Sequence, residues 1–204
     1  FKSANIFFIR TNREIDFGTT NLRQLNEQSL VLDVCDLQDG GTRFAFRYLD
    51  LDVRQYKRLK MFSHAEAGEL GEFLNDGDVS VVLRMGTDFE NNYYEYEVPL
   101  KVTRAGENAP ELIWPDENEI DLEFDQLVNA KQARDRLLSG SGNAISLSRP
   151  YEVDDNGNTI RVKGRPNLAE VRVIMIGVRN RRGGQNNLID DGLAKCAEVW
   201  VNEL

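Results

Sequence analysis

The side chains that most often carry chemistry are scarce in this sequence. Its 204 residues include one histidine, His64, and two cysteines, Cys35 and Cys196. Nucleophilic catalysis needs a nucleophile beside a base, and neither a Gly-x-Ser-x-Gly motif nor a recognised cysteine context supplies one. A structural zinc site needs about four nitrogen or sulfur ligands. We therefore expect no catalytic residues, no metal site, no cofactor and no enzymatic activity, and we interpret His64 as a structural histidine at a strand end.

Carboxylates are abundant, so a glycosidase pair has to be considered. Such a pair needs two carboxyl groups about 5–10 Å apart in different environments. Asp88 and Glu90 flank Phe89, and Glu95 and Glu97 lie two residues apart on one face of an expected strand. Charged side chains in this pattern are typical of a solvated polar face, which is the interpretation that we adopt.

The acidic segment 154–158 has some features of a calcium loop. An EF-hand loop carries glycine at its sixth position and glutamate at its twelfth. Here Gly157 is the fourth residue and Arg165 is the twelfth. Because Asn156-Gly157 tolerates the positive φ angles of a tight turn, the segment instead predicts a hairpin.

An aromatic stretch provides the first candidate binding surface. The period of two along residues 93–102 places Tyr94 and Tyr96 in the core. Phe89 and Tyr93 then remain available. Exposed aromatic rings stack on sugar rings and on other flat apolar faces, so these two residues are candidates for ligand contact.

The basic cluster at residues 179–184 provides the second candidate. Its sequence is Arg-Asn-Arg-Arg-Gly-Gly, and Arg181 and Arg182 are the candidate binding residues. Gly183-Gly184 could form a backbone nest for an anion. The alternatives are a solvated loop and a salt-bridge partner for a neighbouring domain.

Strand-like segments dominate the chain and must position these side chains. They cover residues 29–35, 42–48, 56–63, 79–85, 93–102, 151–153, 159–162, 171–178 and 197–201. Pro99 donates no backbone hydrogen bond, which predicts that its strand is bulged or lies at a sheet edge. One helix is expected from a cap at Asp125 to Leu138. The pattern predicts a mainly β protein, an antiparallel β-sandwich or jelly roll with one substantial helix.

Composition and domain organisation limit the classes of partner. The formal net charge of −9 disfavours non-specific contact with nucleic acid and with anionic lipid. The sequence contains no run of eighteen apolar residues, so no helix is expected to span a membrane. We expect residues 21–204 to form one sandwich domain with a helical excursion around 116–142. Residues 1–20 are expected to be a lead-in segment or part of a neighbouring domain, and both ends resemble cuts in a longer polypeptide.

Six strings carry a more specific signal. They are Leu-Asn-Glu-Gln-Ser-Leu at 25–30, Tyr-Lys-Arg-Leu-Lys-Met-Phe-Ser-His-Ala-Glu at 56–66, Arg-Met-Gly-Thr-Asp-Phe-Glu-Asn-Asn-Tyr-Tyr-Glu-Tyr at 84–96, Ile-Trp-Pro-Asp-Glu-Asn at 113–118, Val-Ile-Met-Ile-Gly-Val-Arg-Asn at 173–180 and Ala-Glu-Val-Trp-Val-Asn-Glu-Leu at 197–204. In these strings the chain resembles the SprA/Sov family, the giant outer-membrane translocons of gliding motility and type IX secretion in Bacteroidetes. The resemblance runs in order from about residue 25 to the end.

The resemblance implies a non-catalytic extramembrane domain of a protein-secretion translocon. Its partners would be other domains of the same protein, accessory secretion subunits or cargo. Its place would be the cell envelope, at the extracellular or periplasmic face of the outer membrane. A second similarity, carried by residues 56–62 and 198–203, is to the jelly rolls of carbohydrate-binding modules. It supplies the alternative, a glycan-binding module of a secreted or cell-surface protein.

The two cysteines lie on an early and a late strand, and such strands are often neighbours in sandwiches. We therefore predict that Cys35 and Cys196 lie close in space. The envelope permits oxidation, so a disulfide is one outcome. Two buried thiols that behave as small hydrophobic side chains are the other.

Overall fold

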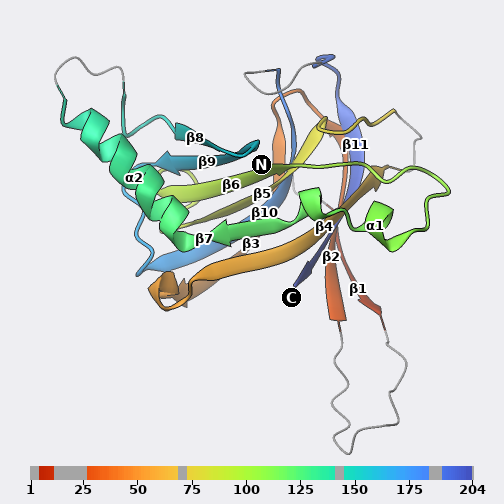
Figure 1. Ribbon diagram of the computed structural model, residues 1–204, viewed down its shortest axis with the longest axis horizontal. Coiled ribbons are helices and arrows are strands. Elements are labelled where there is room, and N and C mark those ends of the chain that lie inside the picture. The colour runs from red at the N-terminus through yellow and green to blue at the C-terminus, as the bar shows by residue number, and fades with distance from the viewer. Residues whose placement is uncertain (1–4, 12–26, 69–72, 141–144, 184–189, 204) are drawn as a thin grey trace, which may run out of the picture.

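The computed structural model describes residues 5–11, 27–68, 73–140, 145–183 and 190–203. Its strands form two antiparallel sheets that pack face to face, and one substantial helix lies beside them (Figure 1). The predicted mainly β sandwich with one substantial helix is therefore confirmed. The finer jelly-roll assignment stays a prediction.

Within the described residues, the first sheet has five strands. Its order is β1 (Asn5–Thr11), β2 (Glu27–Leu37), β11 (Lys195–Glu203), β4 (Arg58–Ala67) and β7 (Ile120–Glu123). The second sheet has six strands in the same described part of the chain. Its order is β3 (Thr42–Leu51), β10 (Val171–Asn180), β5 (Val79–Gly86), β6 (Tyr93–Pro99), β9 (Asn158–Lys163) and β8 (Tyr151–Asp155). The first and last thirds of the chain contribute to both sheets.

The core lies between the two sheets and follows from the alternation of side chains along the strands. In β6 the side chains of Tyr94, Tyr96 and Val98 point into the core, as the sequence predicts. In β11 the core residues are Ala197, Val199 and Val201. Every second residue of these strands points into this core. The residues between them therefore point to the outer faces of the sheets.

Helix α2 (Phe124–Leu138) closes one side of the sandwich. It lies beside β7 of the first sheet and beside β8 and β9 of the second (Figure 1). Glu123 and Gln126 form a capping box at its start, so the predicted cap at Asp125 is wrong. The remaining helical elements are α1 (Pro110–Ile113) and the 3-10 turns η1 (Val53–Gln55) and η2 (Asp116–Asn118).

Three further elements have features that the sequence does not indicate. The excursion expected around residues 116–142 contains strand β7 as well as α2. Strand β6 lies between β5 and β9, so Pro99 does not mark a sheet edge. Pro99 is instead the last residue of the strand, where its missing donor disrupts little of the ladder. Strand β1, in the expected lead-in segment 1–20, pairs with β2.

The cysteines lie on neighbouring strands, β2 and β11, and the structure joins Cys35 to Cys196 by a disulfide. The register between these strands shifts between Lys195 and Ala197, which leaves Cys196 at a bulge. On the β2 side, the residue after Cys35 is Asp36, which has a φ of 51°. The irregular backbone at this point brings the two Cα atoms to 4.0 Å from each other.

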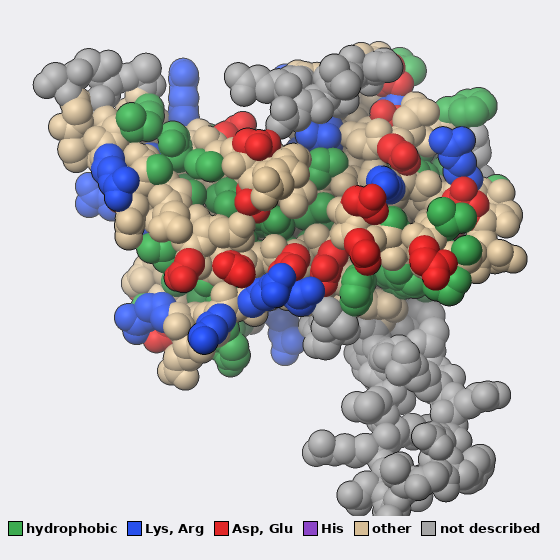
Figure 2. Space-filling view, viewed as in Figure 1, with side chains coloured by type: hydrophobic (Ala, Val, Ile, Leu, Met, Phe, Trp, Pro, Cys, Tyr) green, Lys and Arg blue, Asp and Glu red, His purple; other side chains and the backbone are tan. Residues whose placement is uncertain are grey.

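The acidic composition is visible on the surface. Figure 2 shows Asp and Glu side chains gathered in a band across the face that carries α2 and β7, with Lys and Arg side chains beside them. Ion pairs attach β4 to this segment: Arg58 pairs with Asp121 of β7, and Lys60 pairs with Glu119, the residue before β7, at 2.7 Å. No helix among the described residues is long and apolar enough to cross a membrane.

Candidate functional site

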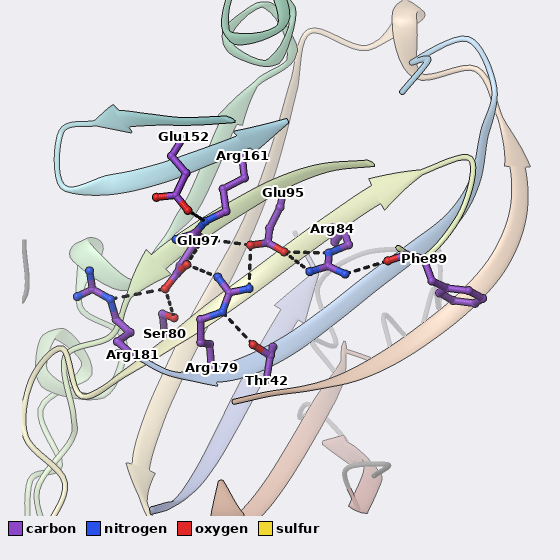
Figure 3. Close-up of polar contacts among 10 residues, drawn as sticks. All are labelled: Thr42, Ser80, Arg84, Phe89, Glu95, Glu97, Glu152, Arg161, Arg179 and Arg181. Carbon is purple, nitrogen blue, oxygen red and sulfur yellow. Dashed lines mark hydrogen bonds and ion pairs between the residues drawn. The ribbon is translucent and has the colours of Figure 1, made fainter. Parts of the chain in front are cut away.

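Charged side chains collect on the outer face of the six-stranded sheet, the face turned away from the other sheet. They form a cluster of two carboxylates and four guanidinium groups. We call it the arginine–glutamate cluster, and its members are Arg84, Glu95, Glu97, Arg161, Arg179 and Arg181. Figure 3 shows these side chains converging from β5, β6, β9 and β10 and from the residue that follows β10.

Strand register explains why the cluster forms. Glu95 on β6 lies directly opposite Arg84 on β5 and Arg161 on β9. Directly opposite residues have Cβ atoms about 4.5–5.5 Å apart on the same face, so these three side chains must meet. Arg179 reaches the same point from β10 and also donates to Thr42 Oγ1 over 2.8 Å.

Glu95 is the most enclosed carboxylate of the cluster, at 1% exposure. Arg84 donates to its Oε2 from Nε over 2.8 Å and from Nη2 over 2.5 Å. Arg179 and Arg161 donate to Oε1 over 2.8 and 3.0 Å. Burial alone would raise the pKa of Glu95, but the three arginine charges outweigh it and hold the pKa below its ordinary value.

Glu97 is held in a similar way at 3% exposure. Its Oε2 accepts hydrogen bonds from Arg161 and Arg179, and its Oε1 accepts one from Ser80 Oγ over 2.7 Å. Burial acts to raise its pKa, but the charges of Arg179 and Arg161 and the Ser80 hydrogen bond outweigh this effect and lower the pKa to about 2. Both glutamates are therefore ionised at neutral pH.

This arrangement corrects the interpretation of Glu95 and Glu97 as a solvated polar face, and it bears on whether they could form a glycosidase pair. Glu95 and Glu97 do not form a solvated polar face, because arginine side chains from neighbouring strands cover them. A glycosidase acid needs a raised pKa so that it can donate a proton. Both glutamates have lowered pKa values and are bound by arginines, so this pair does not fit that role.

A hollow of about 830 Å³ opens over the cluster. Glu95, Glu97 and the buried Tyr93 line it together with three of the arginines and Arg182. Arg182 is exposed and pairs with Asp39 over 3.0 Å. The hollow is therefore lined by polar side chains, and its charged groups take part in ion pairs.

An exposed group of aromatic rings lies on the same face of the sheet, outside the lining of the hollow. Phe46 and Tyr48 on β3 are 56% and 68% exposed, and the half-buried Phe89 lies against both. Ring centroids are 5.0 Å apart for Phe46 and Phe89, 5.4 Å for Tyr48 and Phe89, and 5.7 Å for Phe46 and Tyr48. We call these three residues the aromatic cluster. Arg84 connects it to the arginine–glutamate cluster, because it binds Glu95 and its Nη1 donates to the backbone oxygen of Phe89 over 2.9 Å (Figure 3).

The four predicted binding residues thus lie on one face, in different environments. Arg181 and Arg182 line the hollow, and Phe89 belongs to the aromatic cluster. Tyr93 is 6% exposed and its ring lies 4.0 Å from the Arg84 guanidinium carbon, so it forms part of the floor rather than an open stacking surface. Gly184, one half of the expected anion nest, lies outside the described residues.

Sequence reasoning missed the two most exposed rings of this face. Phe46 and Tyr48 follow Phe44 at a spacing of two, which shows that they share a face. The spacing does not show which face points outward. That depends on Ala45, the core residue between Phe44 and Phe46, and on the partner strand β10.

The remaining candidate for chemistry, His64, is a buried residue of β4. Its Nδ1 lies 2.8 Å from the backbone oxygen of Ile113 and 3.1 Å from Thr103 Oγ1. Its ring packs near Trp114 and Trp200. These contacts fit a structural histidine that attaches the segment around α1 to the sheet.

The acidic segment 154–158 forms a tight hairpin between β8 and β9. Asn156 and Gly157 have φ angles of 54° and 93°. Both values fit the turn that an Asn-Gly pair favours. The segment therefore has the structure that its turn residues predict.

Two comparisons with known proteins complete this description. The SprA_N family model, described as motility related/secretion protein, matches residues 2–204. A search of curated proteins finds no match.

Proposed function

Because the chain belongs to the motility related/secretion protein family, we propose that it is a non-catalytic extramembrane domain of an outer-membrane protein-secretion translocon. The translocon would serve type IX secretion and gliding motility. The match confirms the predicted resemblance to the SprA/Sov family. It covers nearly the whole chain, and this observation carries the proposal.

The structure supports a role in binding. Within the described residues, the largest cluster of buried charged groups consists of carboxylates already bound by arginines. The aromatic cluster beside it exposes large apolar rings to solvent. Exposed aromatic residues and arginines are enriched where proteins contact each other. We therefore infer contacts with other domains of the same protein, with accessory subunits or with cargo, in the cell envelope at the outer membrane.

A glycan-binding module is the second candidate. It is favoured by aromatic rings beside a polar hollow on the outer face of a sandwich sheet. Sugar rings stack on flat aromatic faces. The three rings of the aromatic cluster stand at 75–82° to one another, so they do not share one flat platform. Protein contact is therefore the better supported of the two.

Deletion of residues 2–204 within the full-length protein, with a short flexible joint in their place, tests the proposal. Outer-membrane levels of the shortened protein are compared with those of the intact protein by fractionation. We expect secretion and gliding to be lost while the shortened protein is present in the outer membrane. Normal secretion and motility at normal protein levels would contradict the proposed role.

A further inference from the structure

The arginine–glutamate cluster has an excess of positive charge in its buried part. Four guanidinium groups, 13–17% exposed at their side chains, surround two carboxylates. The exposed carboxylates of Glu152 and Asp154 lie at the rim of the hollow, and Glu152 pairs with Arg161 over 2.7 Å. Charges at an exposed rim are screened by water and salt more strongly than buried ones. This local excess is notable in a chain whose formal net charge is −9.

Arg181 is the least compensated member of the cluster. Its side chain is 13% exposed, and its Nε lies 3.5 Å from Glu97 Oε1. Within the part of the chain that the structure describes, its guanidinium group donates no hydrogen bond. Burial lowers the pKa of Arg181, Glu97 opposes this, and the nearby charges of Arg161 and Arg179 lower it further. An added carboxylate would offset this repulsion and accept the hydrogen bonds that the planar guanidinium group offers in pairs.

The aromatic cluster offers an apolar contact on the same face. Phe46 and Tyr48 project from β3 beside the buried Met175 and Val173 of β10. Large exposed rings next to a buried apolar floor form the kind of contact that anchors an inserted side chain. The face therefore presents an apolar site and a cationic site side by side.

The spacing of the two sites suits an extended chain. Along β10, Met175 lies opposite Phe46, and Arg181 follows Met175 by six residues, just after the end of the strand. Six residues of extended chain correspond to about 20 Å. A bound segment in extended conformation covers the same distance with about six residues.

We propose that the outer face of the six-stranded sheet binds an extended polypeptide segment of a partner protein. A carboxylate of the segment would enter the hollow at Arg181. An apolar side chain about six residues away would pack on the aromatic cluster. The proposal rests on the proposed function in that both assign protein contacts to this domain, and it adds the surface and the chemistry of the ligand.

A random dodecapeptide library displayed on phage, selected on the purified 204-residue chain, tests this proposal. We expect enriched sequences to carry Asp or Glu about six residues from an aromatic or aliphatic residue. Enriched sequences that lack an acidic residue would overturn the proposal, as would the absence of enrichment over a blank surface.

Variants then locate the binding site with a synthetic peptide of the most enriched sequence. Arg181→Gln and Tyr48→Ser should each weaken binding about tenfold or more in fluorescence anisotropy, since each removes one of the two contacts. Arg172→Gln and Tyr56→Ser are matched controls, because Arg172 pairs with Glu170 and Tyr56 is an exposed ring outside the aromatic cluster. Equal affinity of all four variants would overturn the proposal.

Folding and the competing ligand class are checked separately. Tyr48 is exposed, so Tyr48→Ser should retain the urea midpoint of the parent and its loss of binding cannot be attributed to unfolding. A glycan array probes acidic oligosaccharides. Binding of uronic acid oligosaccharides that depends on Arg181 and Tyr48, with no peptide binding, would replace the proposed ligand.

The double variant Arg181→Gln and Tyr48→Ser in the full-length protein separates this proposal from the proposed function. We expect secretion to fall, as in the deletion. If the deletion abolishes secretion and the double variant secretes normally, the proposed surface is wrong and the proposed function stands. If peptides bind as expected and the deletion changes nothing, the surface is right and the proposed function fails.

Discussion

Replacement of Glu97 by glutamine tests the electrostatics of the arginine–glutamate cluster. The change keeps the shape of the side chain and removes its charge. It leaves Arg161, Arg179 and Arg181 with one buried carboxylate in place of two. Loss of one partner from a buried ion pair is strongly destabilising, because the remaining charge is uncompensated.

The lowered pKa sets the expected magnitude. The pKa of Glu97 falls from 4.5 to about 2 on folding. At about 1.36 kcal/mol per pKa unit, ionised Glu97 contributes roughly 3 kcal/mol to stability at pH 7. Because the folded pKa is depressed, this contribution is present above pH 4.5 and is lost as the pH falls through 2. At pH 3 it should be less than half of its value at pH 7.

Urea unfolding of the parent and of Glu97→Gln at pH 7 and pH 3 measures both effects. The variant should be less stable by roughly 3 kcal/mol at pH 7, and the difference should shrink at pH 3. Glu117→Gln, which removes an exposed partner of Lys101, is the control and should leave the midpoint unchanged at both values. A difference at pH 7 that is negligible, or one that is the same at pH 3, would refute the reasoning.

Two further predictions concern the covalent link and the backbone. Reduction of Cys35–Cys196, which spans 161 residues, should lower the free energy of unfolding by about 3–5 kcal/mol, because the unfolded chain loses a constraint. Urea curves with and without a phosphine reductant measure this, and thiol titration of the unfolded, non-reduced protein should detect no free thiol; two free thiols would contradict the bond. Gly164→Ala should destabilise by about 3 kcal/mol, because φ is 65° and the new Cβ would lie 1.9 Å from the Asn91 backbone oxygen. Gly106 has a φ of 90° and no atom near the position of a new Cβ, so Gly106→Ala should cost only the backbone strain, about 1 kcal/mol. Equal losses of stability for Gly164→Ala and Gly106→Ala in thermal melts would exclude the steric explanation.

Much of the fold could be predicted because local periodicity carries it. The spacing of two in residues 93–102 identifies β6 and its core face, and the helical spacing of Leu127, Ala130 and Arg134 identifies α2. The position of a strand within its sheet is set by partners distant in sequence. The central place of β6 and the short strand β7 were therefore missed.

The candidate site was less accessible to sequence reasoning for the same physical reason. Arg181 and Phe89 could be named from local composition. The burial of Glu95 depends on arginines that lie 11, 66 and 84 positions away along the chain. No local pattern indicates that such residues meet, so the glutamate appeared to belong to a solvated face.

Photo-crosslinking from position 48 within the full-length protein tests the central claim that this domain acts through protein contacts. Tyr48, 68% exposed in the aromatic cluster, is replaced by a photo-reactive phenylalanine analogue, and Tyr56, 56% exposed elsewhere, serves as the control position. After irradiation of intact cells, mass spectrometry identifies the linked peptides. The account predicts one defined protein segment, bearing a carboxylate about six residues from an apolar side chain, linked to position 48. Absence of any linked peptide above the yield from position 56 would contradict it.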